Sequence, residues 1–155
     1  MLKGIPDILS PDLLKVLAEM GHGDEIVIGD GNFPAASVAR RLIRADGHGT
    51  CELLKAILAV IPLDTYAEPN VVLMEVVPSD PVRPVIWDDY RTILVAAEGD
   101  QVKVARIKRF AFYERAKTAY AVIASGESAL YANIILKKGV ITSAEVRDMM
   151  KGRTI

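Results

Sequence analysis

The sequence predicts an α/β fold: a three-layer single domain in which helices cover a mixed sheet. Short apolar runs typical of buried strands alternate along the chain with segments whose apolar residues recur at helical spacing. A length of 155 residues and an apolar share of 51% fit one domain with a core of ordinary size. The sequence contains no internal repeat and no low-complexity stretch that would divide the chain further.

The first helix is predicted from its start and stop signals. Ser10 can cap the helix, Pro11 suits its first position, and Asp12 favours the positive end of the helix dipole. Its apolar face then consists of Leu13, Leu14, Leu17 and Met20. Gly21 supplies the stop, so His22 is expected just beyond the end of this helix.

Strands and helices alternate over the rest of the chain. Strands are expected at 25–28, 40–44, 71–77, 102–107, 119–124 and 134–137. Helices are expected at 50–60, 87–97 and 109–117. The domain then spans residues 1–142, and residues 143–155 form a short C-terminal helix or tail. Turn residues follow the first strand, which places Asp30 just after a strand end, the usual position of ligand groups in α/β proteins.

Charge and composition argue against several classes of protein. The formal net charge is -1, and the densest basic run, 103–115, is interleaved with apolar residues as in a strand that enters an amphipathic helix. Cys51 is the single cysteine, so no intrachain disulfide or cysteine metal site is expected. The sequence shows neither a secretory signal nor a run of roughly 20 apolar residues. We therefore expect a cytoplasmic protein without a nucleic-acid or membrane partner.

His22 is the first candidate for chemistry. It stands between Gly21 and Gly23, where the backbone can take unusual angles, and is one of only two histidines. A histidine in such a position is rarely there for packing alone. Because imidazole groups exchange protons near neutral pH, His22 is a candidate for proton transfer.

The familiar cofactor and nucleophile motifs are all incomplete. Neither Gly21-His-Gly23 nor Gly29-Asp-Gly31 continues into a dinucleotide fingerprint, because the third glycine is missing in both. The segment 126–130 lacks the last glycine of a nucleophile elbow, and no histidine follows it. A metal triad of His22, His48 and Asp30 lacks a paired spacing, and His48 is better explained as an exposed loop residue. We expect no metal and no cofactor.

Spacing alone does not assign a function to five further polar or aromatic positions. Tyr131 and Asn133 would face the same side of an extended chain, which by itself is typical of an edge strand that faces water. Arg109 stands at a strand-to-helix passage and is explained equally well as a surface charge. Trp87 and Tyr90 are interpreted as packing residues.

Two blocks, Met20-Gly-His-Gly-Asp-Glu25 and Arg109-Phe-Ala-Phe-Tyr-Glu-Arg-Ala116, resemble specific motifs of the L-fucose mutarotase family. The resemblance extends in order through 10–28, 32–35, 43–47, 109–116 and 126–140, from about residue 2 to about residue 141. This family belongs with D-ribose pyranase in one superfamily, RbsD/FucU, whose ribose branch has a histidine where Arg109 stands. Arg109 therefore points to the fucose branch, while His48 departs from a pattern that is usually apolar at that position.

The resemblance implies an isomerase that interconverts the α and β anomers of L-fucose by opening and closing the sugar ring. It implies His22 as the general acid, and it implies sugar binding by Asp30, Arg109, Tyr131, Ala132 and Asn133. It also implies an RbsD-like fold and a homo-oligomer, a ring-shaped decamer whose sites are shared between subunits. The physiological sugar stays open between fucose, ribose in its pyranose and furanose forms, and a related aldose. The alternative is a non-catalytic monosaccharide-binding protein that is accessory to sugar uptake.

Overall fold

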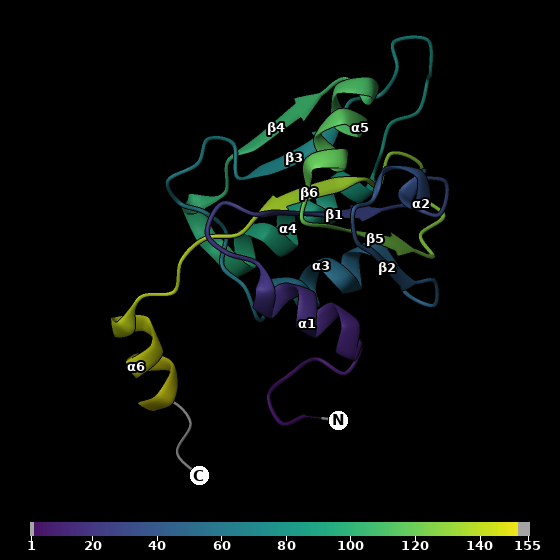
Figure 1. The fold of residues 1–155 in the computed structure, drawn as a ribbon. Helices are drawn as coiled ribbons and strands as arrows, with labels where there is room; N and C mark the ends of the chain where they lie inside the picture. Colours follow the sequence, from purple (N-terminus) through teal and green to yellow (C-terminus); the bar gives the residue numbers. More distant parts are fainter. Residues whose placement is uncertain (1, 152–155) are drawn as a thin grey trace.

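Six strands form one twisted sheet in the order β2-β5-β1-β6-β3-β4 (Figure 1). The computed structural model describes residues 2–151. The strands are β1 (Glu25–Gly29), β2 (Leu42–Ala45), β3 (Val71–Met74), β4 (Val104–Ile107), β5 (Ala121–Ser125) and β6 (Ile134–Lys137). Neighbouring strands run parallel except at β6, which is antiparallel to both β1 and β3. The predicted mixed sheet is confirmed.

Helices cover both faces of this sheet and make the fold three-layered (Figure 1). Their bounds are α1 (Pro11–Glu19), α2 (Ala35–Val38), α3 (Thr50–Leu58), α4 (Ile86–Glu98), α5 (Arg109–Thr118) and α6 (Ser143–Lys151), with a 3-10 turn at Gly99–Gln101. Side chains alternate across β1, so Ile26 and Ile28 pack into a core with α1, α3 and α4. Val27 points the other way, into a core that Phe33 and Phe112 of the α2 and α5 layer complete.

The structure corrects several predicted boundaries. The strand expected at 71–77 ends at Met74, because β3 pairs with β6 only as far as Leu73 and with β4 only as far as Met74. The short helix α2 was not predicted from the sequence. The other predicted elements are present with ends shifted by one or two residues, and Ser10 caps α1 by accepting a hydrogen bond from the Leu13 N–H at 3.2 Å.

The last helix, α6, stands away from the sheet and its covering helices (Figure 1). Its side chains are exposed over 143–149. Residues 152–155 of the predicted tail lie outside the described residues. None of the described helices has both the length and the apolar character needed to span a membrane.

The direction of β6 decides where the candidate residues lie. Because β6 is reversed, its start meets the ends of β1, β3, β4 and β5 at one edge of the sheet, which we call the carboxyl edge. Asp30 follows β1, Arg109 follows β4, and Tyr131–Asn133 precede β6, so all are at this edge. The start of β1 and the end of β6 form the opposite, amino edge, where His22 lies.

Candidate functional site

Asp30 and Asn133 form a reciprocal pair at the carboxyl edge. The Asp30 N–H donates to Asn133 Oδ1, and Asn133 Nδ2 donates to Asp30 Oδ2, both at 2.9 Å. The Asn32 N–H donates to the other carboxylate oxygen, Asp30 Oδ1, at 3.0 Å. Asp30 is 5% exposed and Asn133 is 2% exposed, so the pair is held in one arrangement before any ligand arrives.

Burial also changes the acidity of the Asp30 carboxyl group. Desolvation raises the pKa of Asp30 above its ordinary value, and the hydrogen bonds from Asn32 and Asn133 oppose that rise. A buried carboxylate of this kind binds strongly to any hydroxyl that reaches it, since few water molecules compete. The arrangement suits the recognition of a polyhydroxylated ligand.

Tyr131 takes a backbone conformation that the sequence did not indicate. Its φ is 59°, and it is the one non-glycine position with positive φ among residues 2–151. The chain is therefore not extended at Tyr131, so the condition under which Tyr131 and Asn133 would face the same side does not hold. Trp87 Nε1–H donates to the Tyr131 carbonyl oxygen at 3.0 Å. The Tyr90 hydroxyl lies 3.0 Å from the Ala132 carbonyl oxygen. Helix α4 thus holds the strained segment in place.

The side chain of Tyr131 is held as firmly as its backbone. Its hydroxyl donates to Asp80 Oδ2 at 2.7 Å, and the Val77 N–H lies 3.4 Å from the same hydroxyl oxygen. The hydrogen bond to Asp80 raises the pKa of Tyr131, and the charge of Arg109 acts in the opposite direction. The Tyr131 proton is therefore already committed to Asp80, while an oxygen lone pair is left for a ligand.

Arg109 lies in the same neighbourhood and lines one cavity together with Val77. It is the first residue of α5, its side chain is exposed, and its guanidinium lies 4.7 Å from the ring of Phe110. Both aromatic and aliphatic neighbours line a cavity of about 290 Å³ beside it, including Val77 and Pro78. Among residues 2–151 its guanidinium makes no ion pair within 4.0 Å, so its donors face solvent or a ligand.

His22 lies at the amino edge and is not brought together with Asp30 in one chain. The strand β1 stands between them, and its five residues at about 3.3 Å each separate the two by on the order of 15 Å. His22 Nε2 is 3.1 Å from Asp64 Oδ1, and the side chains are 50% and 6% exposed respectively. The ring of Tyr66 meets the imidazole edge-on, with centroids 5.9 Å apart.

Asp64 determines which nitrogen of His22 is free. Burial opposes the ionisation of Asp64, but hydrogen bonds from the Tyr66 N–H and from His22 outweigh it and hold the pKa below its ordinary value. An ionised carboxylate can only accept, so Nε2 carries a proton and donates to it. Nδ1 is the nitrogen left to exchange a proton with another molecule.

Four residues near the candidate site were missed by sequence reasoning as functional positions. Asp64 and Asp80 are isolated acids in loops, and no local spacing links either of them to its partner. Trp87 and Tyr90 were interpreted as packing residues, and Tyr90 is fully buried in the core, but both also hold the Tyr131–Asn133 segment. The expected loop residue His48 is half-buried, with its Nδ1 3.1 Å from Glu52 Oε1.

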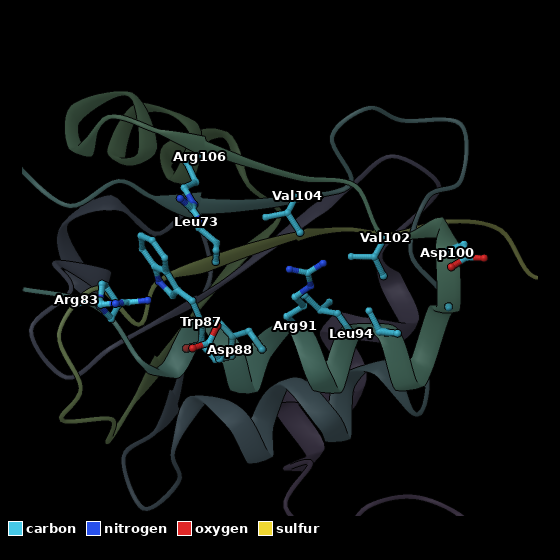
Figure 2. A pocket seen from close by; sticks show the side chains of 14 residues that line it. Leu73, Arg83, Trp87, Asp88, Arg91, Leu94, Asp100, Val102, Val104 and Arg106 are labelled. Carbon is cyan, nitrogen blue, oxygen red and sulfur yellow. The ribbon is translucent and has the colours of Figure 1, made fainter.

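A separate cavity of about 710 Å³ lies between α4 and the β3–β4 side of the sheet (Figure 2). Arg83, Arg91 and Arg106 surround it, and the Arg106 guanidinium stacks 4.7 Å from the Trp87 ring. None of the sequence-predicted site residues lines this cavity, but its lining includes Trp87 and Tyr90, which also contact the backbone of Tyr131 and Ala132. Within residues 2–151 no group of three His, Cys, Asp or Glu side chains is placed to hold a metal.

Comparison with known proteins identifies the family. The model of the RbsD / FucU transport protein family matches residues 3–141. The chain belongs to this family. It is 52% identical over 140 residues to L-fucose mutarotase of Actinobacillus pleuropneumoniae serotype 5b (strain L20), covering 90% of this chain and 97% of the relative. It is 54% identical over 146 residues to fucose mutarotase of Homo sapiens, covering 90% and 94%.

The fold is shared with solved members of the RbsD / FucU family. Fucose mutarotase from Streptococcus pneumoniae, solved in complex with L-fucose, superposes with a TM-score of 0.87 at 52% identity. That superposition covers 91% of this chain and 100% of the other. The predicted three-layer α/β fold and the predicted family are thus both confirmed.

Proposed function

We propose that the protein is a sugar mutarotase, an isomerase that interconverts the α and β anomers of L-fucose. Relatives named fucose mutarotase cover about nine tenths of the chain at 52% and 54% identity, and a solved relative holds L-fucose. The observation that carries the proposal is the carboxyl edge, where a preorganised Asp30–Asn133 pair stands beside Tyr131. Such a set can bind sugar hydroxyls and accept a proton at the same place.

The chemistry requires only proton transfers and positioning. Anomer exchange opens the hemiacetal ring, rotates the aldehyde and closes the ring on its other face. One proton leaves the anomeric hydroxyl and another reaches the ring oxygen, and positioned side chains accelerate such transfers by about 10²–10⁴-fold. Asp30 accepts from sugar hydroxyls, and Arg109 and Asn133 donate to them. Tyr131 and the Nδ1 of His22 are the two groups suited to carry out these proton transfers.

The separation of His22 from Tyr131 supports a homo-oligomer with shared sites. One chain cannot place both groups on one sugar, because β1 keeps them on the order of 15 Å apart. A second copy that brings its half-exposed imidazole to the carboxyl edge of the first would complete the site. The ring-shaped decamer implied by the family resemblance provides such an arrangement. We further propose that residues 1–142 form the catalytic domain, that 143–155 are an appendage, and that the protein acts in the cytoplasm.

NMR exchange spectroscopy of L-fucose and D-ribose tests this proposal. The wild type is expected to accelerate anomer exchange of fucose, and His22→Ala to lose most of that acceleration while it stays folded. His48→Ala is the matched control, because it removes the other histidine, and it should retain full exchange. The family is called the RbsD / FucU transport protein family, and a sugar-binding protein without catalysis is therefore the second candidate. Fucose binding without any acceleration by the wild type would favour that second candidate.

A further inference from the structure

We propose that Asp80 receives the hydroxyl proton of Tyr131 while Tyr131 takes a proton from the anomeric hydroxyl of the sugar. This role rests on the mutarotase activity proposed above. Asp80 acts through Tyr131 and is a positioning and relay residue, whereas Tyr131 is the group that touches the sugar.

The loop that carries Asp80 fixes both of its carboxylate oxygens. Oδ2 accepts the Tyr131 hydroxyl at 2.7 Å, and Oδ1 accepts the Val82 N–H at 3.1 Å. Prolines at 78, 81 and 84 restrict the backbone on both sides of Asp80. The carboxylate is therefore already aimed at the phenol, without reorganisation when a sugar binds.

The hydrogen bonds of Tyr131 limit what its hydroxyl can do. A phenol has one proton and two lone pairs, and here the proton is directed to Asp80 and one lone pair faces the Val77 N–H. Tyr131 can thus meet the sugar as an acceptor. Because Asp80 also raises the pKa of Tyr131, a free phenolate is disfavoured, and the phenol can accept a proton only as it passes its own to Asp80.

The proposed ring-opening step balances in protons and electrons. The sugar O1–H bond breaks and its proton joins the Tyr131 oxygen, while the original Tyr131 proton forms an O–H bond with Asp80 Oδ2. The electron pair of the O1–H bond forms the C1=O1 double bond, and the C1–O5 pair moves to the ring oxygen. That oxygen takes a proton from Nδ1 of a protonated His22 in another copy. Closure on the other face reverses each transfer and restores both groups.

The alternative is that Asp80 only anchors the loop or the Tyr131 side chain. Asp80→Asn separates these readings, because the amide oxygen still accepts a hydrogen bond in nearly the same volume but cannot take up a proton. A purely structural acceptor would tolerate that change. Asp80→Glu keeps a carboxylate and should retain more activity than Asp80→Asn.

The test measures exchange rates of fucose by NMR for the single variants Asp80→Asn, Asp80→Glu and Tyr131→Phe and for the double variant. We expect Asp80→Asn to lower kcat about a hundredfold with a nearly unchanged KM. We also expect Asp80→Asn to have no further effect in the Tyr131→Phe background, since Asp80 acts through that hydroxyl. Asp88→Asn, an exposed acid on α4, is the matched control and should match the wild type.

Three results would overturn the relay while leaving the mutarotase proposal intact: wild-type kcat in Asp80→Asn, full activity in Tyr131→Phe, or an additional loss in the double variant. A wild type that does not accelerate exchange would instead overturn the activity on which the relay rests. The thermal midpoint of each variant shows whether a loss of activity comes from unfolding. If Asp80→Asn unfolds, the test uses Asp80→Glu instead: activity close to that of the Asp88→Asn control supports the relay, and a loss in folded Asp80→Glu contradicts it.

Discussion

The two edges of the sheet carry candidate groups of opposite character. At the carboxyl edge Asp30 and Asn133 are 5% and 2% exposed and bind one another directly. At the amino edge the His22 side chain is 50% exposed and rests on a single buried carboxylate, Asp64. At one edge the candidate groups are buried and hydrogen-bonded to one another, and at the other a half-exposed imidazole points outward.

This difference follows from the topology of the sheet. β1 joins the two edges directly, since His22 precedes the strand and Asp30 follows it, and a buried strand is a rigid spacer. The reversed strand β6 does the same in the other direction, from Asn133 to Lys137, whose carbonyl accepts the Asp64 N–H at 3.0 Å. A single chain is therefore well ordered at both edges and still keeps the two sets of candidate groups apart, which is the reason for proposing a site shared between copies.

Mixing inactive variants tests this division most directly. His22→Ala disables the amino edge and Tyr131→Phe disables the carboxyl edge, so each alone should have little exchange activity. If a site takes one edge from each of two copies, random assembly of equal amounts restores about one quarter of the sites. The measurement is fucose exchange after joint unfolding and refolding. A mixture of Tyr131→Phe with Asp80→Asn, both at the carboxyl edge, is the control and should recover nothing.

Arg109 tests what the carboxyl edge recognises. Its fork of donors can grip neighbouring hydroxyls of the sugar, and a hydrogen bond to a charged group is worth roughly 1.5–3 kcal/mol, or about ten- to a hundredfold. Arg109→His should lose fucose turnover more than ribose turnover, and Arg109→Lys should keep the charge but lose the fork. NMR exchange with both sugars measures this. Unchanged rates in both variants would remove Arg109 from the site.

Local sequence signals were sufficient to predict the elements that place Asp30 at the carboxyl edge. The cap at Ser10, the run at β1 and the turn after it placed Asp30 at a strand end, and the structure agrees. What the sequence could not give is the partner of Asp30, because Asn133 is 103 positions away and meets it only through the β1–β6 pairing. Such a contact depends on strand order, which no local pattern encodes.

The conformation of Tyr131 and the partner of His22 could not be predicted from the sequence for the same reason. The spacing of Tyr131 and Asn133 is typical of an edge strand if the chain is extended, but hydrogen bonds from α4 hold Tyr131 at positive φ. Asp64 was overlooked because a single loop acid has no distinguishing neighbour in sequence. In both cases the contact that decides the structure is a tertiary hydrogen bond rather than a local preference.

Trp87 is expected to have a modest effect on the carboxyl edge. Trp87→Phe keeps an aromatic ring but removes the indole N–H that binds the Tyr131 carbonyl. A neutral hydrogen bond contributes about 0.5–1.5 kcal/mol, so kcat for fucose should fall roughly two- to tenfold as Tyr131 loses its position. Arg106→Gln is the control, because it removes the cation that stacks on Trp87 and leaves the indole N–H in place. Equal losses in both variants would assign the effect to the stacking instead.

Asp64 is expected to give the smallest effect, a pH-dependent change in the stability of the amino edge. Its pKa is lowered in the folded protein, so the stabilisation is present above the ordinary carboxyl pKa of about 4 and is lost as pH falls through the folded value. Asp64→Asn should therefore lower the free energy of unfolding at neutral pH, and the difference from the wild type should shrink in acid. Solvent around the half-exposed imidazole limits its size.

Urea unfolding of the wild type and Asp64→Asn at a series of pH values measures this difference. The control is Asp100→Asn, which removes an exposed acid near the end of α4 that lies outside the amino edge. A constant difference for Asp64→Asn from neutral pH into acid would mean that the carboxylate gains nothing from the Tyr66 N–H and His22. The amino edge would then hold its imidazole by packing alone, and Nδ1 would lose the orientation on which its proposed role depends.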